Sequence, residues 1–224
     1  MPTALITGAG GGLGSAIAAA LAPTHTLLLA GRPSKRLDAV ARRLGARAMA
    51  LDLADTLDIQ ALAAHSDIVD ALDVLVHNAG VAFPDLFVES RIHDWRTTFE
   101  VNVIGPVALT HALLPALRRA KGQVIFVNSG AGLNALAGMA SYSASKFALR
   151  AFADSLRAEE PTLRVTSVHP GRVATAMQRQ LIEFEGGKYD PKHFLRPETV
   201  ARAIADIVAT PPDGHVHQIV IRQR

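Results

Sequence analysis

Short apolar runs alternate along the chain with longer stretches in which apolar residues recur at helical spacing. The runs are continuous, as in Leu27–Ala30 and Val124–Val127, which is typical of strands buried on both faces of a sheet. The predicted strands are Thr3–Thr7, Thr26–Ala30, Ala46–Leu51, Asp73–His77, Gln123–Asn128, Arg164–His169 and Val216–Ile221. The predicted helices are Gly14–Leu21, Ser34–Leu44, Thr56–His65, Ile92–Leu117, Tyr142–Glu159 and Pro197–Ala209.

This regular alternation of strands and helices predicts an α/β fold, a doubly wound parallel sheet of about seven strands with helices on both faces. No linker, repeat or shift in composition divides the chain, so we expect one catalytic domain over residues 1–224. The segment Arg172–Arg196 is irregular and contains Gly186, Gly187 and Pro191. Because it follows a strand end late in the chain, we predict that it forms a mobile lid over a substrate.

Composition narrows the class of protein. The 224 residues are 49% hydrophobic and 19% charged, which suits a globular domain and excludes disordered and fibrous classes. Cysteine is absent, which excludes disulfides, a thiol nucleophile and thiolate metal sites. The net charge is only +3 and the basic residues are scattered, so we expect no nucleic-acid partner.

No apolar run reaches the roughly 18 residues that a membrane span needs, and Met1–Thr3 has no basic leader. We therefore expect a cytoplasmic protein that does not bind membranes. The nine histidines form no H-x-x-x-H or H-E-x-x-H pair, so we expect no metal site.

A glycine-rich loop follows the first strand and opens the first helix. In Thr7–Gly14, Gly8 would permit a tight turn, Gly12 would let backbone N–H groups approach a pyrophosphate, and Gly14 would let the helix pack closely on the strand. Glycine spacing alone is a weak signal, and a flexible turn is the alternative. The position between strand and helix favours a phosphate site.

The spacing T-G-x-x-x-G-x-G resembles that of the short-chain dehydrogenase/reductase family. Three further motifs resemble the same family: Asp52 and Leu53 after the third strand, Asn78-Ala79-Gly80 after the fourth, and Pro170-Gly171-Arg172-Val173-Ala174-Thr175 after the sixth. The resemblance implies a Rossmann-type fold and a nicotinamide dinucleotide. The Asn that usually precedes N-A-G is His77 here, which we interpret as a packed strand-end residue.

The residue after the second strand indicates which cofactor is preferred. NAD enzymes place a carboxylate there on the ribose 2′-hydroxyl, whereas this chain has Ala30-Gly31-Arg32. Arg32 could hold a 2′-phosphate through charge-assisted hydrogen bonds, although a solvated surface charge is the alternative. We therefore expect NADP(H) to be preferred, with NAD(H) possible. The residues expected at the cofactor are Gly8, Gly10, Gly12, Leu13, Gly14, Arg32, Asp52, Leu53, Asn78, Ala79, Gly80, Tyr142, Lys146, Pro170, Gly171, Val173 and Thr175.

Tyr142 and Lys146 stand four residues apart and hence on one face of a predicted helix. A nearby ammonium is expected to lower the pKa of the phenol toward neutrality and make it useful in proton transfer. Such a pair occurs by chance on many helices. Ser129, at the end of the fifth strand, and Asn102 also match the family's positions, which implies a catalytic set of Asn102, Ser129, Tyr142 and Lys146.

In relatives the Asn side chain helps to hold a water beside the lysine. The resemblance thus implies an NADP-dependent oxidoreductase that interconverts a small carbonyl compound and its secondary alcohol by hydride transfer, with tyrosine as acid and base. It also implies a homodimer or homotetramer, with Tyr142–Glu159 in the interface. The alternative function is a non-catalytic NADP sensor on the same fold. A methyltransferase would have no use for the Tyr142/Lys146 pair.

Overall fold

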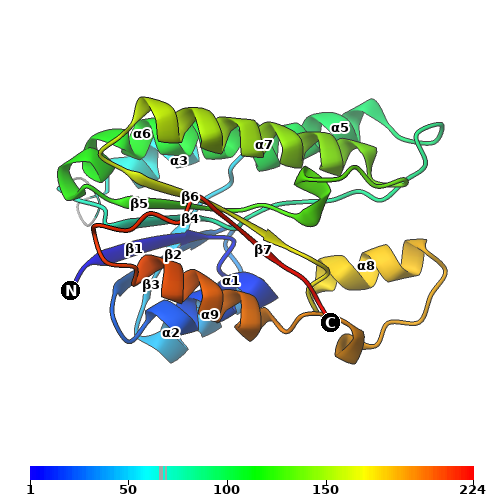
Figure 1. Ribbon diagram of the computed structural model, residues 1–224, viewed down its shortest axis with the longest axis horizontal. Helices are drawn as coiled ribbons and strands as arrows, with labels where there is room; N and C mark the ends of the chain where they lie inside the picture. The colour runs from blue at the N-terminus through cyan, green and yellow to red at the C-terminus, as the bar shows by residue number, and fades with distance from the viewer. Residues whose placement is uncertain (66–67, 69) are drawn as a thin grey trace.

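The computed structural model describes residues 1–65, 68 and 70–224. All the strands belong to one parallel sheet with the order β3-β2-β1-β4-β5-β6-β7 (Figure 1). The strands are β1 (Thr3–Thr7), β2 (Thr26–Gly31), β3 (Arg47–Ala50), β4 (Val74–His77), β5 (Gln123–Val127), β6 (Arg164–Pro170) and β7 (Gln218–Ile221). The predicted fold class is therefore confirmed.

Helices cover both faces of the sheet. The face below the sheet in Figure 1 carries α1 (Gly12–Leu21), α2 (Lys35–Leu44) and α9 (Pro197–Val208), and α1 packs directly on α9. The face above it carries α3 (Thr56–Ala63), α5 (Ile92–Phe99), α6 (Gly105–Ala120) and α7 (Ala140–Glu159). One further helix, α8 (Ala176–Phe184), lies beyond the end of the sheet.

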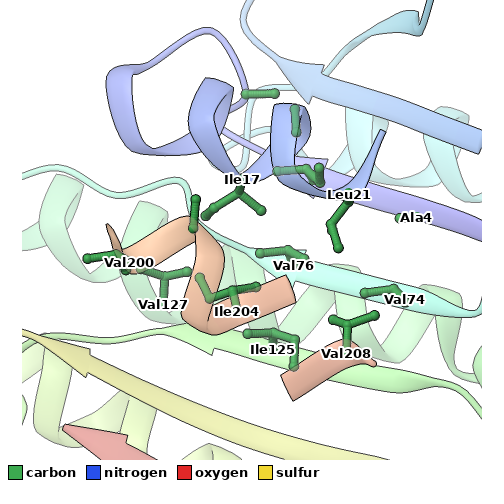
Figure 2. Close-up of a cluster of buried hydrophobic side chains, with 14 of the residues drawn as sticks. Ala4, Ile17, Leu21, Val74, Val76, Ile125, Val127, Val200, Ile204 and Val208 are labelled. Carbon is green, nitrogen blue, oxygen red and sulfur yellow. The ribbon is translucent and has the colours of Figure 1, made fainter. Parts of the chain in front are cut away.

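The strands are apolar on both sides because they pack against a separate core on each face. In Figure 2, Ile17 and Leu21 of α1 and Ile204 of α9 lie against Val76 and Ile125 of the sheet. The residues that alternate with these along the strands, such as Leu75 and Phe126, belong to the opposite core. Each fully buried aliphatic side chain contributes about 1.5–3 kcal/mol, so this patterning supports the sheet from both sides.

The structure corrects two helix predictions. The stretch Ile92–Leu117 is not one regular helix, because a π-helical segment (Glu100–Ile104) separates α5 from α6. The segment Arg172–Arg196 is not wholly irregular, because it contains α8, whose N-terminus is capped by the Thr175 hydroxyl. Hydrophobic periodicity does not distinguish a π-turn from an α-turn, and a nine-residue helix is too short to show its period clearly.

The helical run Ile92–Ala120 is also long and apolar enough to cross a membrane by length and composition, with a mean hydropathy of 1.3 over one window. In the structure Leu109, Leu113 and Leu117 of this run are buried against the sheet. The core therefore accounts for much of its apolar character.

The topology brings the loops after β1, β4, β5 and β6 to one edge of the sheet. From β1 the chain continues to β2 and β3 on one side of β1, and β4 to β7 lie on its other side. The strand order therefore reverses between β1 and β4. Ligands of doubly wound sheets bind at the carboxyl edge beside such a reversal. The motifs singled out in the sequence all lie at this edge.

Candidate active site

The glycine-rich loop is shaped by two close backbone approaches. Gly8 has a φ of +66°, and a Cβ on it would lie 2.8 Å from Ala79 Cα. A Cβ on Gly14 would lie 2.3 Å from the Gly8 carbonyl oxygen and 2.6 Å from Asn78 Nδ2. These contacts give physical reasons for glycine at both positions.

The N-terminus of α1 is open to an anion. Its N-cap is Gly11, which is extended and makes no side-chain cap, so no side chain occupies the N–H groups of the first turn. A Cβ on Gly12 would meet only Thr175 Cγ2, at 3.7 Å. Gly10 packs against the backbone of Leu37, and Leu13 packs against the lower core. The loop therefore offers the donors that a pyrophosphate requires.

Asn78, Ala79 and Gly80 fasten this loop to the end of β4. Asn78 Nδ2 donates to the carbonyl oxygens of Thr7 at 3.0 Å and Gly8 at 3.3 Å. The backbone N–H groups of Asn78 and Ala79 both donate to Thr7 Oγ1, at 3.0 and 3.1 Å. The N-A-G motif thus fixes the shape of the phosphate loop through hydrogen bonds.

Arg32 and Asp52 lie at the two loops beside this site. Arg32 is exposed directly after β2, with no ion-pair partner among the described residues. The Asp52 carboxylate accepts a hydrogen bond from Ala54 N at 3.0 Å. The backbone N–H of Asp52 donates to the Asp58 carboxylate at 2.8 Å. Leu53 is buried and lies close to Gly105. A Cβ added to Gly105 would lie 2.5 Å from the Leu53 carbonyl oxygen.

The structure brings the four candidate catalytic residues together. Ser129 follows β5, Tyr142 and Lys146 lie on α7, and Asn102 lies in the π-helical segment. Ser129 and Tyr142 are both partly exposed, and the Ser129 hydroxyl lies close enough to the Tyr142 phenol to oppose the rise in its pKa. Lys146 and Asn102 are 3% and 1% exposed and lie behind them.

The Lys146 ammonium lies beside Tyr142 and is bound to the end of β5. It donates to the Val127 carbonyl oxygen at 3.1 Å and lies 5.6 Å from the centroid of the Tyr142 ring. Burial raises the pKa of Tyr142, and the hydrogen bond with Ser129 opposes that rise. Burial also lowers the pKa of Lys146 to about 8. The helical spacing predicted the shared face correctly, but the ammonium is directed toward the end of β5.

The side chain of Asn102 is held by the backbone that follows Gly80. Its Oδ1 accepts from Val81 N at 2.8 Å, and its Nδ2 donates to Val81 O at 2.9 Å and to Ser145 Oγ at 3.1 Å. A Cβ on Gly80 would lie 3.2 Å from Asn102 Oδ1 and 3.8 Å from Lys146 Nζ. A side chain at position 80 would therefore crowd the Asn102 amide, and glycine permits the close approach.

The segment after β6 lies next to the phosphate loop. Gly171 N donates to Ile221 O at 2.7 Å, which ties the segment to β7. Val173 is buried and pairs with Leu195. Thr175 Oγ1 accepts from Gln178 N at 3.3 Å, and its methyl carbon lies beside Gly12. Pro170 ends β6, so all four expected contacts are at the carboxyl edge.

Two buried histidines flank the site. His77 is 2% exposed, stacks on Phe126 at 4.9 Å and binds Thr110 Oγ1 at 2.8 Å. Burial lowers its pKa to about 3, so it is a neutral packing residue at neutral pH. His169 is 0% exposed, and its Nδ1 lies 2.9 Å from the Ser129 carbonyl oxygen. Sequence analysis missed His169, because only the pairing of β6 with β5 brings it to Ser129.

A family model described as short chain dehydrogenase matches residues 2–186. The chain belongs to the short-chain dehydrogenase family. It is therefore an oxidoreductase, an NAD(P)-dependent dehydrogenase/reductase. Among the residues that the structure describes, no group of three or more His, Cys, Asp or Glu could hold a metal ion.

Relatives of this short-chain dehydrogenase include a curated mouse protein named dehydrogenase/reductase SDR family member 7B. The two are 34% identical over 219 residues, which cover 91% of this chain and 68% of the mouse protein. An alcohol dehydrogenase from the archaeon Thermococcus sibiricus, complexed with 5-hydroxy-NADP, superposes with a TM-score of 0.89 at 27% identity and covers 100% of this chain and 98% of its own.

A second solved structure is a short chain dehydrogenase from Escherichia coli CFT073 complexed with NADPH. It has a TM-score of 0.89 and 28% identity, and covers 99% of this chain and 95% of its own. Both solved structures carry a nicotinamide dinucleotide, and the open glycine-rich loop of the present chain fits such a group.

Proposed function

We propose that this enzyme interconverts a small carbonyl compound and its secondary alcohol, with Tyr142 as the acid and base. The observation that carries the proposal is the partly exposed pair Ser129 and Tyr142 at the carboxyl edge, with the Lys146 ammonium buried behind it. Two neighbouring hydroxyl groups at one edge are suited to binding one substrate oxygen. The bound dinucleotide supplies or accepts the hydride.

Each residue of the site has a separate task. The Tyr142 hydroxyl gives its proton to the substrate oxygen in reduction and removes the hydroxyl proton in oxidation. The Ser129 hydroxyl binds the same oxygen and fixes its position. Lys146, with its pKa lowered to about 8 by burial, holds the nicotinamide ribose and favours the phenolate. Asn102 would connect Lys146 to solvent through a water for proton resupply.

The reaction is tested by following NADPH oxidation at 340 nm over a panel of ketones and aldehydes, and NADP⁺ reduction over the matching alcohols. The proposal expects turnover of at least one pair. Tight cofactor binding without turnover of any member would contradict it and favour the cofactor-sensing alternative.

The cofactor would lie along Gly8, Gly12 and Gly14, the Asn78–Gly80 segment and the Pro170–Thr175 segment. We propose a preference for NADP(H), because Arg32 is exposed without an ion-pair partner among the described residues and neither Ala30 nor Gly31 offers a carboxylate. Losing a charge-assisted bond to a phosphate costs about 1.5–3 kcal/mol, or roughly tenfold or more in affinity. Arg32→Ala should weaken NADPH by that factor and leave NADH nearly unchanged. Equal dissociation constants for the two cofactors in the wild type would contradict the preference.

We also propose that the segment Arg172–Arg196 is a substrate lid. Its helix α8 ends at Phe184, and the Phe184 ring packs on Gly138. A Cβ added to Gly138 would lie 2.7 Å from Cε1 of that ring. Arg172 and Glu185 form an ion pair of 2.6 Å between the start of the segment and the end of α8. The lid thus touches the turn that leads into Tyr142.

We also propose that the protein is a homodimer or homotetramer and that it is cytoplasmic. On α7, Leu149 and Ala153 are buried in the core, so they do not supply an interface. Phe147 on α7 and Ile104 in the π-helical segment are 42% and 50% exposed, and they are the apolar surface that we assign to a homodimer or homotetramer. The absence of cysteine agrees with a reducing compartment such as the cytoplasm.

A further inference from the structure

His169 is a buried titratable residue that the mechanism above does not use. It is the penultimate residue of β6, is 0% exposed, and lies beside Ser129, which follows β5. Its Nδ1 lies 2.9 Å from the Ser129 carbonyl oxygen. Because a carbonyl oxygen only accepts hydrogen bonds, Nδ1 must carry the proton and donate it.

Ser129 is held through three of its own groups. Its N–H donates to Asn128 Oδ1 at 2.9 Å, and its Oγ accepts from Ala131 N at 3.1 Å. Its carbonyl oxygen accepts from Gly132 N at 3.0 Å and from His169 Nδ1 at 2.9 Å. Of these four bonds only the one with His169 comes from β6. It adds a side-chain contact at Ser129 itself to the backbone bond by which the preceding residue, Asn128, donates to Val168 O at 2.8 Å.

We propose that His169 is a positioning residue for the reaction, acting through the Ser129 main chain to fix the direction of the Ser129 hydroxyl. The proposal rests on the proposed function, in which that hydroxyl binds the substrate oxygen. A reacting group displaced by about 1 Å loses up to about 100-fold in rate, so one backbone hydrogen bond at this serine has a measurable effect.

The surroundings of His169 keep it a fixed donor. Lys146, Arg150 and Arg222 are the charged groups that face it, and together with burial they lower its pKa. Its Nε2 has no hydrogen-bond partner among the described residues, so no group competes for the orientation of the ring. The Arg222 guanidinium donates to the His169 carbonyl oxygen at 3.4 Å and packs over Gly130. His169 therefore acts on Ser129 by geometry, without exchanging protons.

The test compares two amide variants of equal polarity. In His169→Asn the amide nitrogen takes the place of Nδ1 and can still donate to Ser129, whereas in His169→Gln it lies near the place of Nε2 and cannot. We expect the Asn variant to keep kcat within about threefold of the wild type and the Gln variant to lose about 10- to 100-fold. The dissociation constant of NADPH, measured by fluorescence, should stay within about twofold in both.

A double-mutant cycle separates positioning from general damage to the fold. With Ser129→Ala as background the hydroxyl is absent, so the Asn and Gln variants should differ by less than about twofold in kcat. Equal kcat values with Ser129 present, or a difference that persists in Ser129→Ala, would overturn the inference. If the Gln variant does not fold, His169→Leu replaces it and the same two comparisons apply.

The outcomes also separate this inference from the function beneath it. If Ser129→Ala alone keeps wild-type kcat, the proposed role of Ser129 is wrong and the inference fails with it. If Ser129→Ala loses two to three orders of magnitude, as loss of an oxyanion-type donor predicts, and the His169 variants show no Asn–Gln difference, only the inference fails.

Discussion

Gly14 and Gly12 differ by two positions in the phosphate loop, but substituting them should have opposite effects on stability. A Cβ on Gly14 would lie 2.3 Å from the Gly8 carbonyl oxygen and 2.6 Å from Asn78 Nδ2. Neither atom can yield easily, because one is backbone and the other is hydrogen-bonded to Thr7 and Gly8. Gly14→Ala must therefore push α1 away from the loop.

The expected cost of that overpacking is about 1–3 kcal/mol. For a domain of this size each kcal/mol lowers Tm by about 2–4 °C, so Gly14→Ala should melt roughly 2–12 °C below the wild type and bind NADPH more weakly. In Gly12→Ala the new methyl meets only Thr175 Cγ2, at 3.7 Å, and alanine is a better helix former than glycine by up to about 1 kcal/mol.

Gly12→Ala should therefore melt at or above the wild-type temperature. It should nevertheless bind NADPH at least about tenfold more weakly, because the methyl group would stand between the backbone and the pyrophosphate. Differential scanning fluorimetry without cofactor and a fluorescence titration with NADPH measure the two effects. A Gly14→Ala protein that melts within about 1 °C of the wild type, or a Gly12→Ala protein with wild-type affinity, would refute this account of the loop.

Two further predictions concern stability and assembly. The pKa of His77 is about 3 in the folded protein and 6.5 without burial, so the unfolded chain binds the extra proton and stability falls as the pH drops from 6.5 toward 3. His77→Gln should reduce the pH dependence of the free energy of unfolding by up to about 1.4 kcal/mol per pH unit. Urea unfolding between pH 4 and 7 measures this dependence, and equal slopes of the free energy of unfolding against pH in both proteins would count against the prediction. Light scattering at micromolar concentration should find a dimer or tetramer that Phe147→Arg weakens, and a wild-type monomer would contradict the interface.

The fold was predictable because its sheet is buried on both faces. Continuous apolar runs such as Val124–Val127 have few other uses in a chain of this composition, and the strict alternation with amphipathic stretches determined the architecture. The glycine loop and the Tyr142/Lys146 pair were predictable because local spacing places them on one loop and one helix face, and because both resemble the pattern of the short-chain dehydrogenase/reductase family.

The features that the sequence left out depend on contacts between distant segments. The π-helical segment that carries Asn102 has the same apolar pattern as its α-helical neighbours, so periodicity could not reveal it. His169 meets Ser129 only through strand pairing, across 40 positions of sequence. The direction of the Lys146 ammonium, toward Val127 O, depends on the packing of α7 on β5.

The proton chemistry of Tyr142 is the central claim, and Tyr142→Phe tests it most directly. Steady-state kinetics on an accepted carbonyl substrate should be measured beside a fluorescence titration of NADPH, in the wild type and the variant. The account predicts that kcat falls by at least about 100-fold, the range of general acid–base catalysis, while the NADPH dissociation constant stays within about twofold. A variant that keeps more than about a tenth of wild-type kcat, well above what loss of the general acid permits, would contradict it.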